Sequence, residues 1–348
     1  MHTLQFRDIA AKPVHLHENQ MMLGNQTYQL DTIIEGQKWR LSLSAIHRYL
    51  RESAYVYGEP FHIPAAAVIF DLNHELDVLG HFLPLITQLS SDERAQFMMR
   101  LNALLRDPHL PIRLPYATAV TRIPLSARAL IAGQILMCFF YRNDVITTLL
   151  TTKPTFDLFL NVADYARAGG VGGGCYDLHA HRVLLHLPRL YEGFFDTIPG
   201  VCPLLHEMGH MLDGTSMRQM LYGECRGEFP SMTRSQHSTF AAAKAAEYAC
   251  YMAHYHGRAP ADGRYPLGHP YVFQTDGEFI AGYWEMFWRN PHTMATQCPT
   301  LFAALCDYTQ CDPRQALPTD YMGYVDGNRA FYRSGERPWP SQIRYHIS

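Results

Sequence analysis

The sequence predicts an α+β fold, in which a mixed sheet packs against one central helix and additional helices complete the body. Three observations support this fold class. Helical patterns recur between residues 82 and 311, strand-like runs lie between residues 144 and 187, and a Pro-Gly pair at 199–200 breaks the chain before the central helix. With 348 residues the chain can bury a sizeable core, so one large domain or two smaller ones are expected.

Two helices are predicted before the strand-like region. Ser90 and Glu93 have the spacing of a capping box, which predicts a helix that begins there and ends near Arg106. A second helix is expected over residues 126–141, a strongly apolar stretch. Because this stretch is too short to cross a bilayer, it predicts a buried helix.

Strands are predicted over residues 144–150, 156–162 and 176–187, where β-branched residues and alternation occur. The glycine-rich run at residues 169–174 lacks the Lys-Ser/Thr pair of a phosphate-binding loop, which favours a flexible connection. Three histidines of the last strand are interpreted as strand-face residues rather than metal ligands: His179, His181 and His186.

The second half of the chain is predicted to be mainly helical. One helix begins near residue 201, ends at Asp213 and is closed by Gly214 in the C′ position. Further helices are expected over residues 239–256, 276–289 and 299–311. Residues 316–348 hold many Tyr, Trp and Pro residues, which predicts a tail docked on the body.

Composition argues against several classes of function. The net charge of −3 gives no electrostatic basis for binding nucleic acid or an anionic membrane surface. The eight cysteines form no CxxC pair, which favours free thiols in a reducing compartment. The N-terminus lacks the basic and apolar regions of a signal peptide, so a cytoplasmic protein without membrane association is expected.

The strongest chemical signal is the segment His206-Glu207-Met208-Gly209-His210. Residues four apart lie on one face of a helix, so the two histidines can present their imidazoles to one metal ion. The glutamate beside the first histidine reaches the open coordination position, where a general base is needed. This H-E-x-x-H pattern in an apolar, amphipathic segment is typical of zincin metallopeptidases, so the expected core is zincin-like.

A zinc site of this kind needs a third protein ligand. The metzincin pattern would place Gly at position 213 and His at position 216, but the chain has Asp213 and Ser216 there, which excludes that branch. A glutamate from a later helix is the alternative, and five are candidates: Glu224, Glu228, Glu247, Glu278 and Glu285.

These glutamates also have simpler interpretations. Glu247 lies on an Ala-rich helix whose outer face needs charge, and Glu278 has the spacing of a capping box with Thr275. Spacing alone leaves the cap and the metal ligand open for Glu278. Glu285, seven residues further on, shares its helix face and could orient a ligand, or it could be a solvated charge.

Three segments resemble, in the same order, the Mlc titration factor A family of zinc-dependent peptidases: HEMGHMLDG, YVFQTDGEFIAGYWEMFWRNP and CPTLFAALCDYTQCDP. Members of that family read like HEFAHKLD, then have a Tyr seven residues before the Glu of an EFFAV-x-SE-x-FF-x-x-P stretch, then a Pro-initiated helix ending in DP. The resemblance covers roughly residues 76–314. The active site of the family is similar to that of anthrax lethal factor.

The resemblance implies a role for each matching residue. His206, His210 and Glu278 would bind one zinc ion per chain, and Glu207 would be the general base. Tyr271, seven residues before Glu278, would stabilise the oxyanion. Two acidic residues match family positions that are expected to orient the ligands: Asp213 and Glu285. The chain departs from the family at EFIAGYWE, which stands where members have EFFAV-x-SE.

The implied function is a zinc-dependent peptidase, as an endopeptidase or an aminopeptidase, in which a zinc-activated water attacks the peptide bond and Glu207 takes its proton. The family name implies an alternative, a regulatory protein that binds and sequesters a transcriptional repressor with little or no peptidase activity. The complete set of base, ligands and tyrosine favours the enzyme. A strand within residues 176–187 is expected to pair with an extended peptide substrate.

Three segments follow from this interpretation. Residues 1–75 are an N-terminal extension of unknown role, residues 76–315 form the zincin-like metallopeptidase domain, and residues 316–348 are the docked C-terminal segment.

Overall fold

The computed structural model describes most of the chain from residue 83 to residue 320, together with four short strands near the N-terminus. The described residues are 4–7, 13–17, 20–23, 26–29, 83, 85–107, 109–115, 125–159, 162–186, 190, 202–221, 228–256, 263–320, 325, 328–329 and 332–333. The chain separates into two compact units, residues 1–137 with 153–197, and residues 138–152 with 198–348. The segment boundaries expected near residues 75 and 315 stay predictions.

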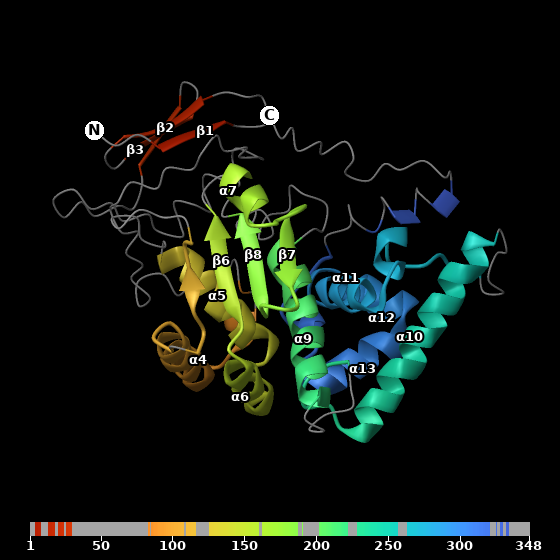
Figure 1. The fold of residues 1–348 in the computed structure, drawn as a ribbon. Coiled ribbons are helices and arrows are strands. Elements are labelled where there is room, and N and C mark those ends of the chain that lie inside the picture. Colours follow the sequence, from red (N-terminus) through yellow and green to blue (C-terminus); the bar gives the residue numbers. More distant parts are fainter. Residues whose placement is uncertain are drawn as a thin grey trace. The chain divides into compact units, whose positions relative to one another are not determined.

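The described residues of the first unit include two four-stranded sheets (Figure 1). One is an antiparallel meander within the predicted N-terminal extension, with its strands in chain order: β1 (Leu4–Arg7), β2 (Pro13–His17), β3 (Gln20–Leu23) and β4 (Gln26–Gln29). The other has the order β5 (Ile112–Arg113), β6 (Thr155–Phe159), β8 (Arg182–His186) and β7 (Gly174–Asp177). In it β5, β6 and β8 are parallel and β7 is antiparallel to β8, so this sheet is mixed.

The stretch predicted as one strand over residues 176–187 is a hairpin instead. A turn separates β7 from β8, and within it His181 has a φ of 50° and bonds its Nδ1 to the hydroxyl of Tyr176 at 2.6 Å. His179 and His181 are therefore turn residues, whereas His186 ends β8. Because β8 is an inner strand and β7 an edge strand, β7 is the part of this stretch that lies at a sheet edge.

In the described part of the first unit four helices accompany these sheets: α3 (Leu85–Gln88), α4 (Ser91–Leu104), α5 (Leu125–Cys138) and α7 (Val162–Arg167). The capping box at the start of α4 is confirmed, because Ser90 and Glu93 each accept from the other's backbone. The glycine-rich run connects α7 to β7. There Gly170 leaves no room for a Cβ, which would lie 2.3 Å from the ring of Tyr165.

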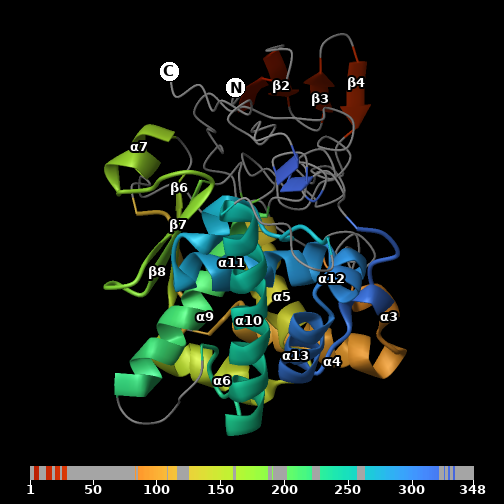
Figure 2. The ribbon, with the colours of Figure 1, turned by 90° about the vertical axis from the view of Figure 1, so that its right-hand side faces the viewer.

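The part of the second unit that the structure describes is helical. Its elements are α6 (Asn143–Thr152), α9 (Pro203–Leu221), α10 (Arg234–Tyr255), the 3-10 turn η1 (Pro270–Phe273), α11 (Asp276–Arg289), α12 (Pro291–Gln297), α13 (Pro299–Thr309) and the 3-10 turn η2 (Pro313–Gln315). Figure 2 shows α10 running beside α13, a pair that is in close contact. Both α12 and α13 begin with proline, whose fixed φ suits the first helical position.

Two element predictions in this unit are wrong. Residues 144–150 form part of α6 and not a strand, because their buried residues Val145, Ile146 and Leu149 follow a helical period that overrides the β-branched composition. Gly214 does not end the helix of the metal-binding motif. Helix α9 continues for seven residues to Leu221, and the residues after the glycine, Thr215 and Ser216, are buried.

Helix α11 forms the centre of the second unit and packs along α9. Every residue from Phe279 to Asn290 is buried, as expected of a helix that is surrounded by other elements. Its large side chains join an aromatic core in which Trp284 stacks on Phe139 with ring centroids 5.4 Å apart. This packing holds the start of α11 against the middle of α9.

The described residues form an α+β fold with a small mixed sheet, so the predicted zincin-like fold class is confirmed. The packing of that sheet against α9 stays a prediction. Among the helices of the described ranges, none has the length and apolar character needed to cross a membrane.

Candidate metal centre

Helix α9 presents the two histidines of the H-E-x-x-H segment on one face, as their spacing predicts. The rings of His206 and His210 are 5.1 Å apart between centroids and nearly perpendicular, and both side chains are mostly buried. Glu207, which follows the first histidine, is 5 % exposed. A buried charge without a partner is costly. The side chains of His206, Glu207 and His210 therefore each need a group of opposite charge or a hydrogen-bond partner when they are ionised.

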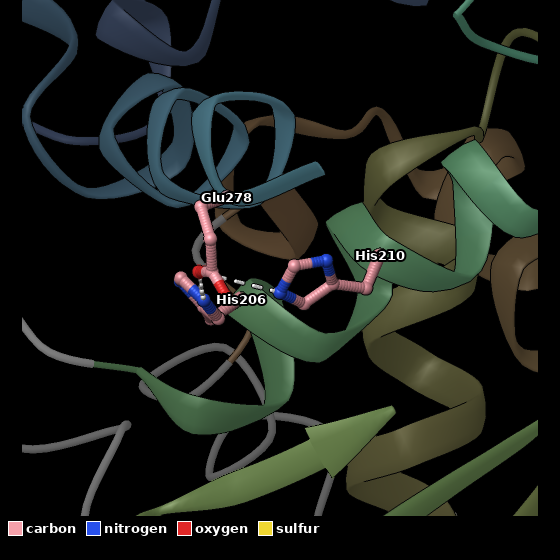
Figure 3. Close-up of side chains that lie close together, drawn as sticks. All are labelled: His206, His210 and Glu278. Atoms are coloured by element: carbon pink, nitrogen blue, oxygen red, sulfur yellow. Dashed lines mark hydrogen bonds and ion pairs between the residues drawn. The ribbon is translucent and has the colours of Figure 1, made fainter. Parts of the chain in front are cut away.

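The partner comes from α11. Figure 3 shows Glu278 pointing from the start of α11 toward both imidazoles. Its Oε2 lies 3.3 Å from Nε2 of His206 and 3.5 Å from Nε2 of His210. The three residues form the one group of potential metal ligands found among the described residues. Two ligand atoms of a tetrahedral zinc ion, each bonded at about 2.0–2.1 Å, are about 3.3–3.4 Å apart, so this spacing fits such an ion.

Glu278 reaches the histidines because α9 and α11 approach backbone to backbone. A Cβ on Gly209 would lie 2.5 Å from the Cα of Ala281, whereas carbon atoms in van der Waals contact are about 3.5–4.0 Å apart. Only glycine fits this position of α9. The glycine inside a helical motif was the available sequence signal for a close contact, but its partner on α11 is not visible from the sequence.

The alternative interpretation of Glu278 as a helix cap holds for its backbone but not for its side chain. Thr275 is the N-cap of α11 and its hydroxyl accepts from the backbone N–H of Glu278 at 3.1 Å. The carboxylate does not complete a capping box and lies between the imidazoles instead. The cap therefore fixes the main chain from which the carboxylate extends.

The second carboxylate oxygen of Glu278 accepts a hydrogen bond from Tyr271. The hydroxyl of Tyr271 lies 2.7 Å from Oε1, and the ring is 45 % exposed on the turn η1. The structure thus brings the tyrosine to the cluster from a separate element. Its hydroxyl lies within one hydrogen bond of a potential metal ligand.

Two further carboxylates lie behind the histidines. Oε2 of Glu285 is 3.3 Å from Nδ1 of His206, and its Oε1 accepts from the backbone N–H of Cys202 at the start of α9. On the other side, Oδ2 of Asp213 and Nδ1 of His210 both lie 3.5 Å from the position that a Cβ on Gly277 would occupy, so this carboxylate is near the second histidine. His206 therefore has a carboxylate on the side away from Glu278, as metal-binding histidines usually do.

The electrostatics of the cluster favour a positive charge between the carboxylates. Burial opposes protonation of His206, but its bonds with Glu278 and Glu285 outweigh burial and raise the pKa of the imidazole to about 10. Burial would also raise the pKa of Glu278, but hydrogen bonds from His206, His210 and Tyr271 hold it well below its usual range. A proton or a divalent cation can supply this positive charge.

Two acidic groups beside the histidines, Glu207 and Asp213, are less easily ionised than usual. Burial raises the pKa of Glu207, although the charges of His206 and His210 oppose the shift. Burial likewise raises the pKa of Asp213 to about 6, against the opposing charge of His210. A carboxylate whose pKa approaches neutrality is suited to exchanging protons at neutral pH.

The other glutamates considered as third ligands are engaged elsewhere or lie outside the described residues. Glu224 is outside them. Glu228 pairs with Lys244 at 2.8 Å. Glu247 is not an outer-face charge, as its surroundings had suggested, because it is 2 % exposed and bonded to Arg264 and Tyr283.

The model of the glucose-regulated metallo-peptidase M90 family matches residues 166–310. The matched segment contains the whole cluster: both histidines and Glu207 on α9, Tyr271 on η1 and Glu278 on α11. A comparison with curated proteins found no match. The family match supports a metallopeptidase-like protein that uses a divalent metal ion. The resemblance drawn from the three motifs is confirmed: residues 166–310 of this chain are similar to the glucose-regulated metallo-peptidase family M90.

Proposed function

We propose that the chain is a zinc-dependent peptidase whose zinc ion is held by His206, His210 and Glu278. One observation carries this proposal: two imidazole nitrogens and a carboxylate oxygen, a ligand set that zinc prefers, lie within 4.8 Å of one another, and the oxygen is 3.3 and 3.5 Å from the two nitrogens, close to the separation of two ligands in a tetrahedral site. When bound, zinc supplies a Lewis acid and lowers the pKa of a coordinated water toward neutrality. The carboxylate of Glu285 behind His206 supports the same assignment, because it fixes that ring in the orientation seen.

Glu207 is the proposed general base. It is adjacent to His206 in the sequence and buried, and burial raises the pKa of its carboxyl. The carboxylate accepts a proton from the attacking water and returns it to the leaving amine. Retaining a proton between these two steps is easier for a carboxyl whose pKa lies nearer neutrality, because the protonated form is then better populated.

Tyr271 is the proposed oxyanion donor. In the structure its hydroxyl donates a hydrogen bond to Glu278. The O–H group therefore lies next to a potential zinc ligand and can act as a hydrogen-bond donor there. Donation to the oxygen of the tetrahedral carbon would replace this bond during the reaction. Such an interaction stabilises the transition state more than the substrate, and it therefore acts on kcat.

The test combines metal analysis with a peptide-cleavage assay. Purified protein is expected to hold one zinc ion per chain and to cleave members of a peptide library, whereas Glu207→Gln is expected to keep zinc and lose cleavage. The amide retains the size of the carboxylate but cannot accept the proton of water. Substrates with free and acetylated N-termini distinguish aminopeptidase from endopeptidase activity.

Two outcomes would overturn the proposal. Wild-type cleavage by Glu207→Gln would remove that residue as the base. A zinc-bound wild type that cleaves no peptide but binds a transcriptional repressor tightly would support sequestration instead, with the cluster as a structural site.

A further inference from the structure

Among the described residues of the second unit, the most deeply buried carboxylate lies on α10, outside the metal centre, and is paired with an arginine. Glu247 is 2 % exposed, and its two oxygens have different partners. Oε1 accepts from Nη1 of Arg264 at 2.5 Å, and Oε2 accepts from the hydroxyl of Tyr283 at 2.8 Å. Arg264 belongs to the segment before η1, whereas Tyr283 lies on α11, five residues after Glu278.

Arg264 and Tyr283, the two partners of Glu247, hold the same short segment of the chain, residues 264–268, which we call the strap. Its first residue is fixed through its side chain and through its carbonyl, which accepts from Nε2 of His254 at 2.9 Å. The guanidinium of Arg264 also donates to the carbonyl of Gln297 at 3.2 Å. At the other end of the strap, the backbone N–H of Gly268 donates to the hydroxyl of Tyr283 at 3.3 Å. Glu247 thus ties both ends of the strap to α10 and α11.

The strap leads directly into the turn that carries Tyr271. Gly268 packs so closely on this turn that a Cβ there would lie 2.4 Å from Cγ2 of Val272 and 3.2 Å from the ring of Tyr283. Tyr271 itself is half-exposed, so its position depends mainly on the main chain on either side of η1. Thr275 fixes the side toward α11 and the strap fixes the other.

Stability alone does not explain this ion pair, in which Glu247 is buried and the side chain of Arg264 is 24 % exposed. Taking a charge out of water is costly, and apolar replacements of buried ion pairs are often neutral or stabilising. A pair of this kind can instead hold one arrangement of the chain against alternatives, since breaking it leaves a buried charge without its partner. Here the arrangement that it fixes is the entry to η1.

We propose that Glu247 is a positioning residue for Tyr271: through Arg264 and Tyr283 it holds the strap so that the tyrosine hydroxyl is delivered to the metal centre. This inference rests on the proposed function for its kinetic effect, but its structural part can be measured without catalysis. A displacement of about 1 Å at a catalytic group is enough to lower a rate about a hundredfold, so a looser strap has a measurable cost.

The first experiment is hydrogen–deuterium exchange on the zinc-loaded wild type and on Glu247→Gln. Faster exchange is expected in residues 264–275, with unchanged exchange in α9. The control is Asp157→Asn, which weakens another buried carboxylate, 1 % exposed, that pairs with Arg113 and Arg182. It is expected to lower thermal stability without changing exchange in the strap. Unchanged exchange in the strap of Glu247→Gln would overturn the inference, whether or not the protein cleaves peptides.

The second experiment is a double-mutant cycle on a fluorogenic peptide selected from the library. Glu247→Gln is expected to lower kcat about ten- to a hundredfold, with KM and zinc content changed less than about twofold. Combined with Tyr271→Phe it is expected to lower kcat no further, because the hydroxyl that it positions is already gone. An equal loss in both backgrounds would overturn the inference, since Glu247 would then act independently of Tyr271.

A milder variant covers the case in which Glu247→Gln does not fold. Tyr283→Phe keeps the ring and removes only the hydroxyl that joins Glu247 to Gly268. As in Glu247→Gln, we expect faster exchange in residues 264–275 and a loss of kcat that disappears in the Tyr271→Phe background. Both effects are expected to be smaller than in Glu247→Gln. Wild-type exchange and wild-type kcat in this variant would also contradict the proposal.

Discussion

Replacing Gly209 with alanine would place a methyl group in the closest contact between α9 and α11. The new Cβ would lie 2.5 Å from the Cα of Ala281, about 1 Å or more short of an ordinary carbon–carbon contact. The atom that it meets is main chain, so no side-chain rotation relieves the contact. The helices must therefore separate, and α11 carries Glu278 three residues before the contact.

The expected effect on metal binding follows from the tolerance of a metal site. Bond lengths in such sites vary by only about 0.2 Å, so a displacement of about 1 Å removes Glu278 from bonding distance. The zinc dissociation constant should rise at least about 10- to 100-fold, the range seen when only the outer partners of ligands are disturbed. Overpacking costs about 1–3 kcal/mol of stability, of which the better helix propensity of alanine offsets about 1 kcal/mol.

Competition with a chromophoric zinc chelator measures this constant on metal-stripped protein, and circular dichroism checks that the helices remain. The matched control is a second alanine variant away from the metal centre. Gly133→Ala, in the other compact unit, meets the side chain of Leu83 at 2.4 Å and reports overpacking alone. Wild-type zinc affinity in folded Gly209→Ala would refute the claim that this contact positions the third ligand.

Three other predictions concern the same cluster. Tyr271→Phe should lower kcat about ten- to a thousandfold while KM, zinc content and thermal stability barely change, and an unchanged kcat would remove the tyrosine as a donor. Glu285→Gln should raise the zinc dissociation constant about 10- to 100-fold in the chelator assay, because His206 loses the charge behind its Nδ1; an unchanged constant would show that this carboxylate is not needed. Since the metal-free pKa of His206 is about 10, this ring is protonated at pH 7 and must lose its proton to bind zinc, so affinity should rise with pH by up to about tenfold per unit between pH 7 and 9. Calorimetry in buffers of different ionisation enthalpy should detect about one proton released from this ring, and binding without any proton release would contradict the pKa.

The local part of the metal centre was predictable from the sequence, and the distant part was not. His206 and His210 meet because a helix places residues four apart on one face, a rule that needs no knowledge of the rest of the chain. Glu278 lies 68 residues after His210, and it was one of five candidates until the resemblance was considered. Its place between the histidines depends on the packing of α11 against Gly209, which no local pattern encodes.

The errors in the fold have the same origin. For residues 144–150 the β-branched composition favoured a strand, but the buried face of α6 decides the structure. For Gly214 the residue type favoured a helix end, but the packing of Thr215 and Ser216 carries α9 onward. For Glu247 the Ala-rich helix, whose outer face needs charge, favoured a surface position, but its partner Arg264 lies in a distant stretch rich in Gly and Pro and holds it in the interior.

The burial of α11 also bears on how this protein could diverge. Because Phe279 to Asn290 are buried, each substitution there must conserve volume or be compensated by a neighbour. The exposed residue Gln274, between the turn and the helix, is under weaker constraint than the buried helix and than Tyr271 and Thr275, which have roles in the site. Relatives that take different substrates are therefore expected to differ at this position, while the helix that carries the third ligand changes slowly. New specificity could then evolve beside the metal centre without rebuilding it.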